Sequence, residues 1–475
     1  MMWVQIDRSS SIPLTKQVCR QLRAKILRRE LSAGERLPPS RTFAKELGVS
    51  RNVIMSVYEQ LMSEGYLESR KGSGTYVTQG SYLEDYRDAY QNGFSHKEPA
   101  QPSQHTDDVI DFATGTPDLS CFPRNIWAKL LRETCLDAPD EVFNYDTPQG
   151  QIALRRSLSK FLLKSKGIRC HPEQIIILSG SAQGFFVLAN VLAIPEHDII
   201  IEDPVYNGIQ QIFTALALPL YPIPVDENGL QVEHIPHGKK ASFVSVTPSH
   251  QFPMGCILPI QRRVKLIEYA RKTQTYIVEN DYDSEFRYSG SPITALHVLD
   301  PDRVVHIGTF SESLYPALRL GYMIVPDALL KQCRVFMHTN SFASSVLKQL
   351  TLTRFIDEGY LEGHIGKMKK LYKKKRQTLI RCLQETFGGR IVISGDSTGL
   401  YVVVRFEDIT FSEKLVNDLH DRGVRIYPIE EHAIRKGRHS HTVLLGYGNL
   451  LQEKIPQSIT NLSRLLAERC RFFTQ

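Results

Sequence analysis

The stretch 175-IIILSGSAQG-184 decides the fold of this chain. Its first four residues are apolar, which is typical of a strand buried on both faces of a sheet, and Gly180 allows a tight turn directly after it. From Ser181 onward the pattern is helical, so the stretch predicts a strand that leads through a short turn into a helix. The backbone N–H groups of Ser181, Ala182 and Gln183 would then face outward at the helix N-terminus, where an anion binds favourably.

The same succession of strand and helix continues toward the C-terminus. Further apolar runs, each followed by a helical pattern, are 198-DIIIE-202, 242-SFVSV-246, 276-YIVEN-280 and 304-VVHIG-308. Strands that alternate with helices in this way predict an α/β fold with a mostly parallel sheet covered on both faces. Residues 345 to 475 continue the α/β pattern, so we expect a smaller C-terminal α/β subdomain within a domain that covers residues 109–475.

The first 79 residues are organised differently. Apolar positions at helical spacing predict three short helices between residues 13 and 64, the second capped by Ser40 and the third by Ser50. Two strand-like runs follow, joined by the glycine-containing loop 70-RKGSG-74. Three helices and a hairpin predict a winged helix-turn-helix over residues 10–79.

Charge and side-chain chemistry indicate that this N-terminal part binds DNA. Residues 1–80 carry 13 of the 58 Lys and Arg residues but 7 of the 51 acidic ones, so most of the net charge of +7 lies here. In a helix-turn-helix the start of the second helix enters the major groove, where Arg reads guanine and Asn reads adenine. The candidate DNA contacts are Arg41, Arg51 and Asn52 on the helices, and Arg70, Lys71, Gly72 and Gly74 on the hairpin. A module that mediates only protein contacts is the alternative.

Residues 80–108 are rich in polar residues, Pro and Gln and predict a linker. The N-terminus lacks an apolar signal core, and no apolar run is long enough to span a bilayer, so we expect a cytoplasmic protein with no membrane partner. The eight cysteines include no CxxC pair, which favours reduced thiols and no metal site.

Ordered motifs in both parts resemble known families. In the N-terminal part, 37-LPPSR-41, 46-ELGVSRN-52, 64-EGYL-67 and 72-GSGTYV-77 resemble the GntR family of bacterial regulators. In the larger part, 178-LSGSAQG-184, 203-DPVY-206, 247-TPSHQFPMG-255, 280-NDYDSEFRY-288 and 309-TFSESLYPALR-319 together resemble a fold-type I aminotransferase. A GntR-like head joined to such a domain is the pattern of the MocR subfamily of transcription regulators. The resemblance implies a homodimer, a double-stranded DNA operator, pyridoxal phosphate and a small-molecule effector.

The resemblance also implies roles for individual residues. Tyr206 is expected to stack on the pyridine ring, Tyr282 to contact the phenolic oxygen, and Tyr145 to reach the phosphate site of the neighbouring subunit. The residues expected to hold the phosphate are Ser181, Ala182, Thr309, Ser311 and Arg319. For Tyr145 and Tyr206, plain core packing is the alternative.

Two positions depart from the family pattern. Glu312 stands where the family has the lysine that forms an imine with the cofactor, and a carboxylate cannot form that bond. Asn280 stands where the family has the aspartate that keeps the pyridine nitrogen protonated. Asp281 is adjacent, but neighbouring side chains of a strand face opposite ways. We therefore expect a catalytically inactive domain; the arginine that grips a substrate carboxylate in the family also has no assigned counterpart within 426-IYPIEEHAIRKGR-438.

Three functions remain open from the sequence. The first is a regulator whose aminotransferase-like domain senses a vitamin B6 form, an amine or an amino acid without a covalent bond; pyridoxamine phosphate is one candidate. The second is an aminotransferase with a DNA-binding appendage, which Glu312 and Asn280 oppose. The third is a ligand-independent DNA-binding dimer.

Overall fold

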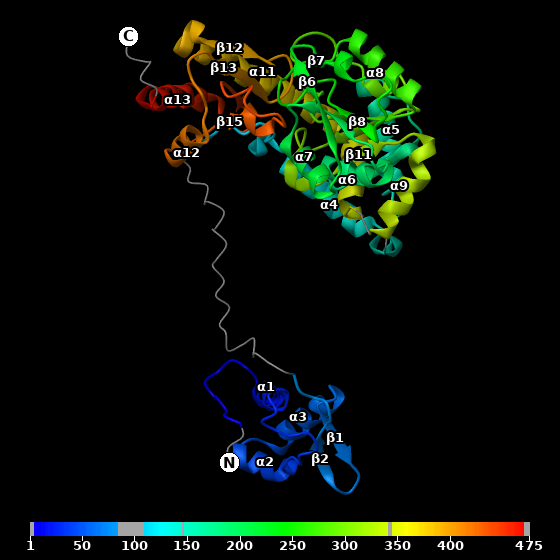
Figure 1. Ribbon diagram of the computed structural model, residues 1–475, viewed down its shortest axis with the longest axis vertical. Coiled ribbons are helices and arrows are strands. Elements are labelled where there is room, and N and C mark those ends of the chain that lie inside the picture. The colour runs from blue at the N-terminus through cyan, green and yellow to red at the C-terminus, as the bar shows by residue number, and fades with distance from the viewer. Residues whose placement is uncertain (1–3, 84–108, 145–146, 341–343, 470–475) are drawn as a thin grey trace. The chain divides into compact units, whose positions relative to one another are not determined.

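A computed structural model describes residues 4–83, 109–144, 147–340 and 344–469 (Figure 1). The chain forms two compact units, residues 1–104 and residues 105–475, which we call the head unit and the large unit. The linker predicted for residues 80–108 lies mostly outside the described residues. Within the described part of the chain, no helix is long and apolar enough to cross a membrane.

The head unit contains three helices and a hairpin, in the predicted order. These elements are α1 (Leu14–Leu27), α2 (Ser40–Leu47), α3 (Arg51–Ser63), β1 (Leu67–Arg70) and β2 (Gly74–Val77). Leu22, Phe43 and Ile54 are fully buried where the three helices meet. The segment before α2 lies along the hairpin, because the N–H of Leu37 donates to the carbonyl of Thr75 at 2.9 Å. The head extends beyond the predicted start at residue 10, since Val4 is buried in the same core.

The caps of α2 and α3 set the helix-turn-helix. Ser50 caps α3 as predicted, and its hydroxyl accepts the N–H of Val53 at 3.4 Å. The predicted cap at Ser40 is wrong: Ser40 is the first residue of α2, Pro39 is the capping residue, and no side chain caps this helix. Pro39 has a φ of −54° and an extended ψ of 139°, and its ring carries no hydrogen-bond acceptor for the N–H groups of the first turn. Gly48 ends α2 with a left-handed φ of 63°.

The large unit is built on an eight-stranded sheet. The strand order is β4 (Ile175–Leu178), β11 (Gly321–Ile324), β10 (Val304–Thr309), β9 (Tyr276–Asp281), β8 (Phe243–Val246), β5 (Ile199–Asp203), β6 (Leu220–Asp226) and β7 (Gly229–Leu230). The neighbours from β10 to β6 pair in parallel, whereas β11 is antiparallel to both of its neighbours. The sheet is therefore mostly parallel, as predicted.

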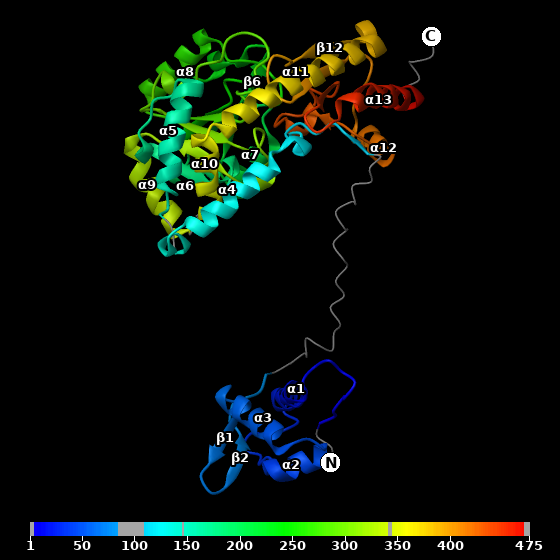
Figure 2. The same ribbon diagram turned by 180° about the vertical axis from the view of Figure 1, so that it is seen from behind.

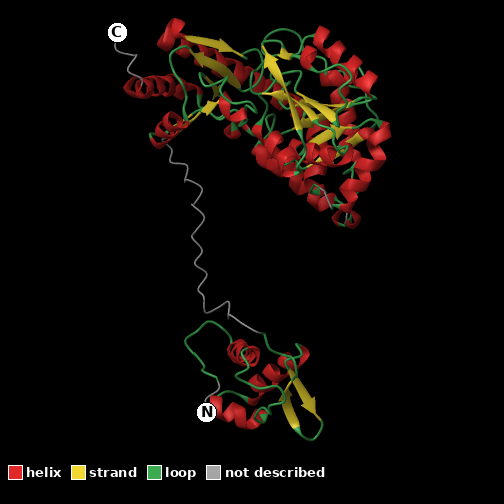
Figure 3. Ribbon diagram, in the orientation of Figure 1, coloured by secondary structure: helices red, strands yellow, loops and turns green. Residues whose placement is uncertain are grey.

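Helices cover both faces of this sheet (Figure 3). One face packs against α6 (Ser181–Leu192), α7 (Asn207–Ala215) and α9 (Asp327–Thr339). The other packs against α4 (Arg124–Asp137), α5 (Ile152–Lys166), α8 (Ile260–Thr273) and α10 (Val346–Asp357). Alternate residues of β4 face opposite sides, Ile176 toward α6 and Ile177 toward α5.

A smaller subdomain follows α11 (Tyr360–Phe387), which runs from the end of α10 toward it (Figure 2). Its sheet has the order β12 (Ile391–Ser394), β13 (Tyr401–Phe406), β16 (Thr442–Gly446) and β15 (Tyr427–Pro428), with α12 (Glu413–Asp421) and α13 (Ile455–Arg469) beside it. At the other end of the large unit's sequence, β3 (Ile110–Asp111) pairs in parallel with β14 (Val424–Arg425). The small subdomain therefore includes the residues that directly follow the linker, which the sequence did not predict.

Candidate ligand site and DNA-binding face

The N-terminus of α6 lies beside the ends of β10 and β11. Gly321 pairs with Thr309 on one side and with Leu178 on the other, which brings the turn before α6 next to the end of β10. The guanidinium of Arg319 packs on Gly180, where an added Cβ would lie 2.9 Å from its Nη2. Gly180 also has a φ of 99°, so both its conformation and its neighbour require glycine.

The predicted phosphate-binding residues converge at this point. The hydroxyl of Thr309 donates to that of Ser311 at 3.0 Å, and the N–H of Ser311 donates back to Thr309 Oγ1 at 3.1 Å. The backbone N–H of Gln183 is engaged with the carbonyl of Gly180 at 3.2 Å, and its side chain accepts the N–H of Ser179. Gln183 thus shapes the turn, while Ser181 and Ala182 supply the first two N–H groups of α6.

Arg319 adds a positive charge beside the N-terminus of α6. Its backbone has a left-handed φ of 52°, a conformation that costs free energy for a residue with a Cβ. Within the described residues its guanidinium forms no ion pair and is exposed. The N-terminus of a helix carries a partial positive charge, so the guanidinium and the helix end together favour an anion between them.

Glu312, unlike Arg319, contributes a buried carboxyl group. Its Oε2 atom is buried and has no hydrogen-bond partner in the structure. Burial, followed by the charge of Asp283, raises the pKa of Glu312 well above the ordinary value for a glutamate. Its protonated form is therefore favoured more than that of an exposed glutamate, and a nearby cation would favour the ionised form.

Asp281 faces away from the candidate site, as the alternation of strand residues predicts. Its carboxylate lies 2.6 Å from the ammonium of Lys166 and accepts the hydroxyl of Ser284 at 2.9 Å. Burial alone would raise the pKa of Asp281, but the charges of Lys166 and His306 and the hydrogen bonds from Lys166 and Ser284 together outweigh burial and hold the pKa below the ordinary value. Asn280 shares its face with Val278, which packs in the cluster that contains α6. Asp281 therefore does not replace the missing aspartate.

Tyr282 belongs to a buried polar group that the sequence did not predict. Its hydroxyl lies 3.0 Å from Nδ1 of His250 and 3.2 Å from the hydroxyl of Tyr401, and His250 Nδ1 is 2.8 Å from Asp283. His250 stands in the motif 247-TPSHQFPMG-255, which offered a sequence signal for it. Tyr401 comes from the small subdomain and had none.

The structure describes Tyr206 but not Tyr145, the two tyrosines expected to contact the cofactor. Tyr206 is 52% exposed and meets the ring of Phe252 edge-on at 5.8 Å between centroids, so plain core packing does not explain it. Tyr145 lies outside the described residues.

The role of the arginine that grips a substrate carboxylate stays unassigned. Arg435 and Arg438 are exposed, and the backbone of Arg435 donates to Asp203 at 3.2 Å. Phe252 packs against the small subdomain's apolar cluster and against the ring of His432, 5.0 Å away between centroids. The buried members of that cluster are Tyr401, Val403, Ile429 and Leu444.

The described residues offer no metal site, and their cavity lies elsewhere. Among the described residues, no group of three His, Cys, Asp or Glu side chains could hold a metal ion. A cavity of about 380 Å³ lies between α4 and α10, and it shares no residue with the candidate site.

The candidate DNA contacts lie on the surface of the head unit. Arg41, Arg51 and Asn52 are exposed at the first turns of α2 and α3. Arg70 is less available than predicted, because it pairs with Glu68 at 2.7 Å. Lys71, Gly72 and Gly74 lie at the tip of the hairpin, where both glycines have positive φ.

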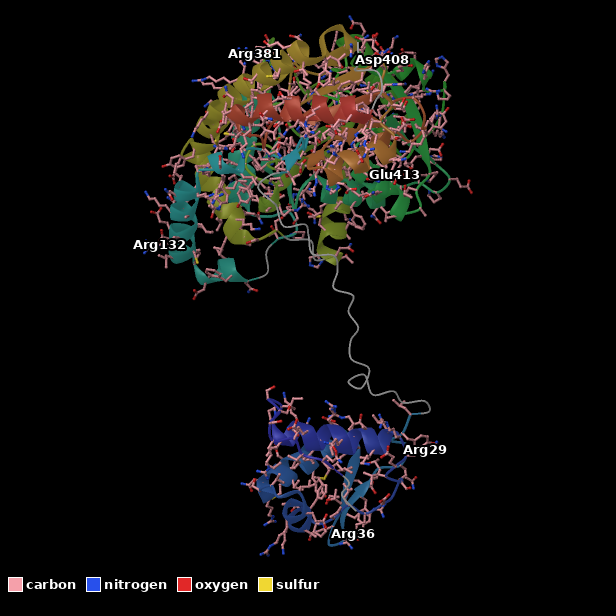
Figure 4. The ribbon with its side chains drawn as sticks, turned by 90° about the vertical axis from the view of Figure 1, so that its left-hand side faces the viewer. Arg29, Arg36, Arg132, Arg381, Asp408 and Glu413 are labelled. Carbon is pink, nitrogen blue, oxygen red and sulfur yellow. The ribbon has the colours of Figure 1, made fainter. Side chains whose placement is uncertain are left out.

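The structure adds two arginines that the sequence analysis missed. Arg36 packs on Gly74, where a Cβ would lie 2.9 Å from its Nε, and it lies on the side of the head away from α1 (Figure 4). Arg8 donates to the carbonyl of Gly48 at 2.6 Å, in the turn between α2 and α3.

Comparisons with known proteins match both units. Residues 107–439 match the family of class I and II aminotransferases, and residues 14–77 match the gntR family of bacterial regulatory proteins. The chain is 35% identical to the uncharacterized HTH-type transcriptional regulator YdeL of Bacillus subtilis, over 96% of this chain and 97% of that protein. It is 32% identical to the probable rhizopine catabolism regulatory protein MocR of Rhizobium meliloti, over 96% and 94%.

Two further similarities concern vitamin B6 and fold. The chain is 31% identical to the HTH-type pyridoxine biosynthesis transcriptional regulator PdxR of Corynebacterium glutamicum, over 80% of this chain and 79% of that protein. Among solved structures, it is similar to the kynurenine aminotransferase of Pyrococcus horikoshii in complex with PMP. The TM-score is 0.71 with 28% identity, over 80% of this chain and 98% of that one.

Proposed function

Because the chain belongs to the MocR subfamily of GntR-type transcription regulators, we propose that its aminotransferase-like unit senses a phosphorylated small molecule by reversible, non-covalent binding. The head unit binds double-stranded DNA as a GntR-type winged helix-turn-helix does. The proposal makes the large unit a sensor and not an enzyme.

The observation that carries this proposal is the position of Arg319. Its guanidinium packs on Gly180 at the N-terminus of α6, without an acidic partner in the described residues. Thr309 and Ser311 add two hydroxyls. Such an arrangement suits a phosphate, which accepts hydrogen bonds from all three kinds of donor.

The residues present do not fit covalently held pyridoxal phosphate. That cofactor supplies an aldehyde that bonds to an amine, but position 312 offers a carboxyl with a buried, unpartnered oxygen. Asn280 provides no charge to keep a pyridine nitrogen protonated, and Asp281 is held by Lys166. We infer that the ligand carries an amine in addition to its phosphate, as pyridoxamine phosphate does. The kynurenine aminotransferase of Pyrococcus horikoshii supports this choice, because its fold accommodates PMP.

Titration calorimetry tests the proposal directly. The wild-type protein should bind pyridoxamine phosphate more tightly than pyridoxal phosphate, and Arg319→Ala should weaken both, by about 10- to 100-fold for a charge-assisted phosphate contact. Arg132→Ala, which removes an exposed arginine of α4, is the matched control and should bind as the wild type does. Tighter binding of pyridoxal phosphate, with a side-chain adduct that borohydride fixes, contradicts the proposal.

The functional unit is proposed to be a homodimer. Tyr145 is expected to complete the phosphate site of the second subunit, and two heads would read two half-sites of an operator. Light scattering of the full chain should give twice the mass of one chain, with one operator bound per dimer. Turnover of amino donors would favour the aminotransferase alternative, and an operator affinity that no vitamin B6 form or amine changes would favour the ligand-independent dimer.

A further inference from the structure

Tyr401 belongs to the small subdomain, yet its hydroxyl contacts Tyr282, a residue of the candidate ligand site. The side chain is fully buried, 3.2 Å from the hydroxyl of Tyr282, and it donates to the carbonyl of Gln251 at 3.4 Å. The rings of His250 and Phe252 lie 5.1 Å and 5.5 Å from its own. Tyr401 thus links the two parts of the large unit by a polar contact inside an otherwise aromatic environment.

The hydroxyl of Tyr282 has more neighbours than it has protons. It lies within reach of His250 Nδ1 and of Tyr401, and Asp283 approaches the same nitrogen at 2.8 Å. A phenol has one proton to donate. A ligand oxygen that takes this proton therefore changes the hydrogen bonds of Tyr401, because buried polar groups need partners.

Tyr401 is also connected to the start of the large unit. It is the first residue of β13 and pairs with Gly446, the last residue of β16. The N–H of Gly446 donates to the carbonyl of Phe112 at 2.9 Å. A Cβ on Gly446 would lie 1.9 Å from the carbonyl oxygen of Ala113, so the two segments are in direct backbone contact. A displacement of β13 and β16 therefore displaces residues 112–113 as well.

Residues 112–113 directly follow β3, where the chain arrives from the head unit. Asp111 is held to the small subdomain, because it accepts the hydroxyl of Tyr427 at 2.8 Å and its carbonyl accepts the amide of Asn449 at 2.9 Å. The pairing of β3 with β14 adds backbone hydrogen bonds. The small subdomain therefore holds the point at which the large unit continues into the linker sequence.

We propose that Tyr401 is a ligand-sensing residue that transmits occupancy of the candidate site, through Gly446 and Phe112, to the chain segment that leads to the DNA-binding head. This inference rests on the proposed function, because it requires a ligand in the site. Tyr401 is a positioning residue: it responds to the ligand through Tyr282 and sets the position of β3.

The substitution Tyr401→Phe tests this role because it removes only the hydroxyl. We would measure the affinity for pyridoxamine phosphate by calorimetry and the affinity for an operator, selected from random duplexes with the full chain, with and without this probe. Tyr401→Phe should keep the ligand affinity within about threefold. The ratio of the two operator affinities, which allosteric coupling sets at roughly 5- to 150-fold in the wild type, should fall close to one.

The matched control is Tyr447→Phe. Tyr447 is equally buried in the small subdomain, but its hydroxyl donates to the carbonyl of Gly399, which also accepts Tyr288. This variant should keep the wild-type ratio. Hydrogen exchange of the peptide that spans residues 109–116 gives a second measurement: the ligand should slow exchange in the wild type and in Tyr447→Phe but not in Tyr401→Phe.

Each outcome separates this inference from the proposed function. Wild-type coupling in a folded Tyr401→Phe protein overturns the transmission through Tyr401 and leaves ligand sensing intact. A wild-type protein that neither binds pyridoxamine phosphate nor changes its operator affinity overturns both.

Discussion

At the scale of single residues, Glu312 has the largest effect on the chemistry of the site. Burial and the charge of Asp283 raise the pKa of its carboxyl, and a neighbouring ammonium would favour its charged form. Glu312→Gln should therefore preserve the unfolding temperature. It should reduce the affinity for pyridoxamine phosphate by about 10- to 100-fold, because a charge-assisted hydrogen bond is lost. Calorimetry and thermal unfolding measure the two effects.

The contrary result for Glu312 is an unchanged affinity in Glu312→Gln, which would place the amine elsewhere. Glu453→Gln, at an exposed glutamate of the same unit, serves as the control for charge removal alone.

Glu202 predicts a pH dependence of stability. It is buried beneath the N–H of Thr247, 3.1 Å away, and burial raises its pKa to about 8 from the ordinary 4.5. The folded protein thus binds this proton more tightly than the unfolded chain does, so the stabilisation is complete below about pH 4.5 and is lost as the pH rises through 8. Glu202→Gln should flatten the decline of the large unit's free energy of unfolding between about pH 5 and about pH 9, by roughly a few kcal/mol. Scanning calorimetry at several pH values measures it, and an equal slope in both proteins would contradict the assignment.

Predictions for single residues succeeded where the local backbone geometry determines the direction of a side chain. The alternation of strand residues placed Asn280 and Asp281 on opposite faces, and the structure agrees. The same reasoning could not find Tyr401, because it meets Tyr282 only after residues 119 positions apart fold together.

At the scale of elements, the turn into α6 depends on Gly180. Alanine there would meet Arg319 at 2.9 Å and would adopt a φ of 99°. Gly180→Ala should destabilise the large unit by more than about 1 kcal/mol and weaken binding of inorganic phosphate. Gly363→Ala is the matched control: in α11 its Cβ meets no heavy atom within 4 Å, so it should stabilise the helix by roughly 0.5–1 kcal/mol. Calorimetric unfolding and phosphate titration compare the two, and equal phosphate affinity in both would contradict a site at this helix end.

We expect α3 to be the recognition element of the head. Arg51→Ala should cost about 1–3 kcal/mol for the operator and relax specificity at one base pair, because a bidentate contact to guanine is lost. Arg23→Ala, whose side chain pairs with Glu64 on the head, should leave specificity unchanged. Competition binding against single-base operator variants measures both, and a uniform loss across all sequences would make Arg51 a phosphate contact.

The elements themselves followed from periodicity and turn residues, with errors at their ends. Ser40 was wrong as a cap because α2 begins one residue earlier than predicted, at Ser40 itself. The pairing of β3 with β14 escaped prediction, since each strand has two residues and their pairing joins distant parts of the chain.

At the scale of the whole molecule, the order of motifs predicted two units and the family, and the comparisons confirm the family. The extent of the small subdomain could not be predicted. It recruits residues 110–113 by backbone contacts with Gly446 and Arg425, and such contacts leave no pattern in side-chain chemistry.

The carboxyl at position 312 has one more consequence, for the timing of gene control. A ligand held by an imine leaves only after a bond is hydrolysed, whereas departure from the proposed non-covalent site would be limited by dissociation alone. The duration of a transcriptional response would then depend on how long each ligand molecule stays bound. The protein could respond to a fall in ligand concentration as quickly as to a rise.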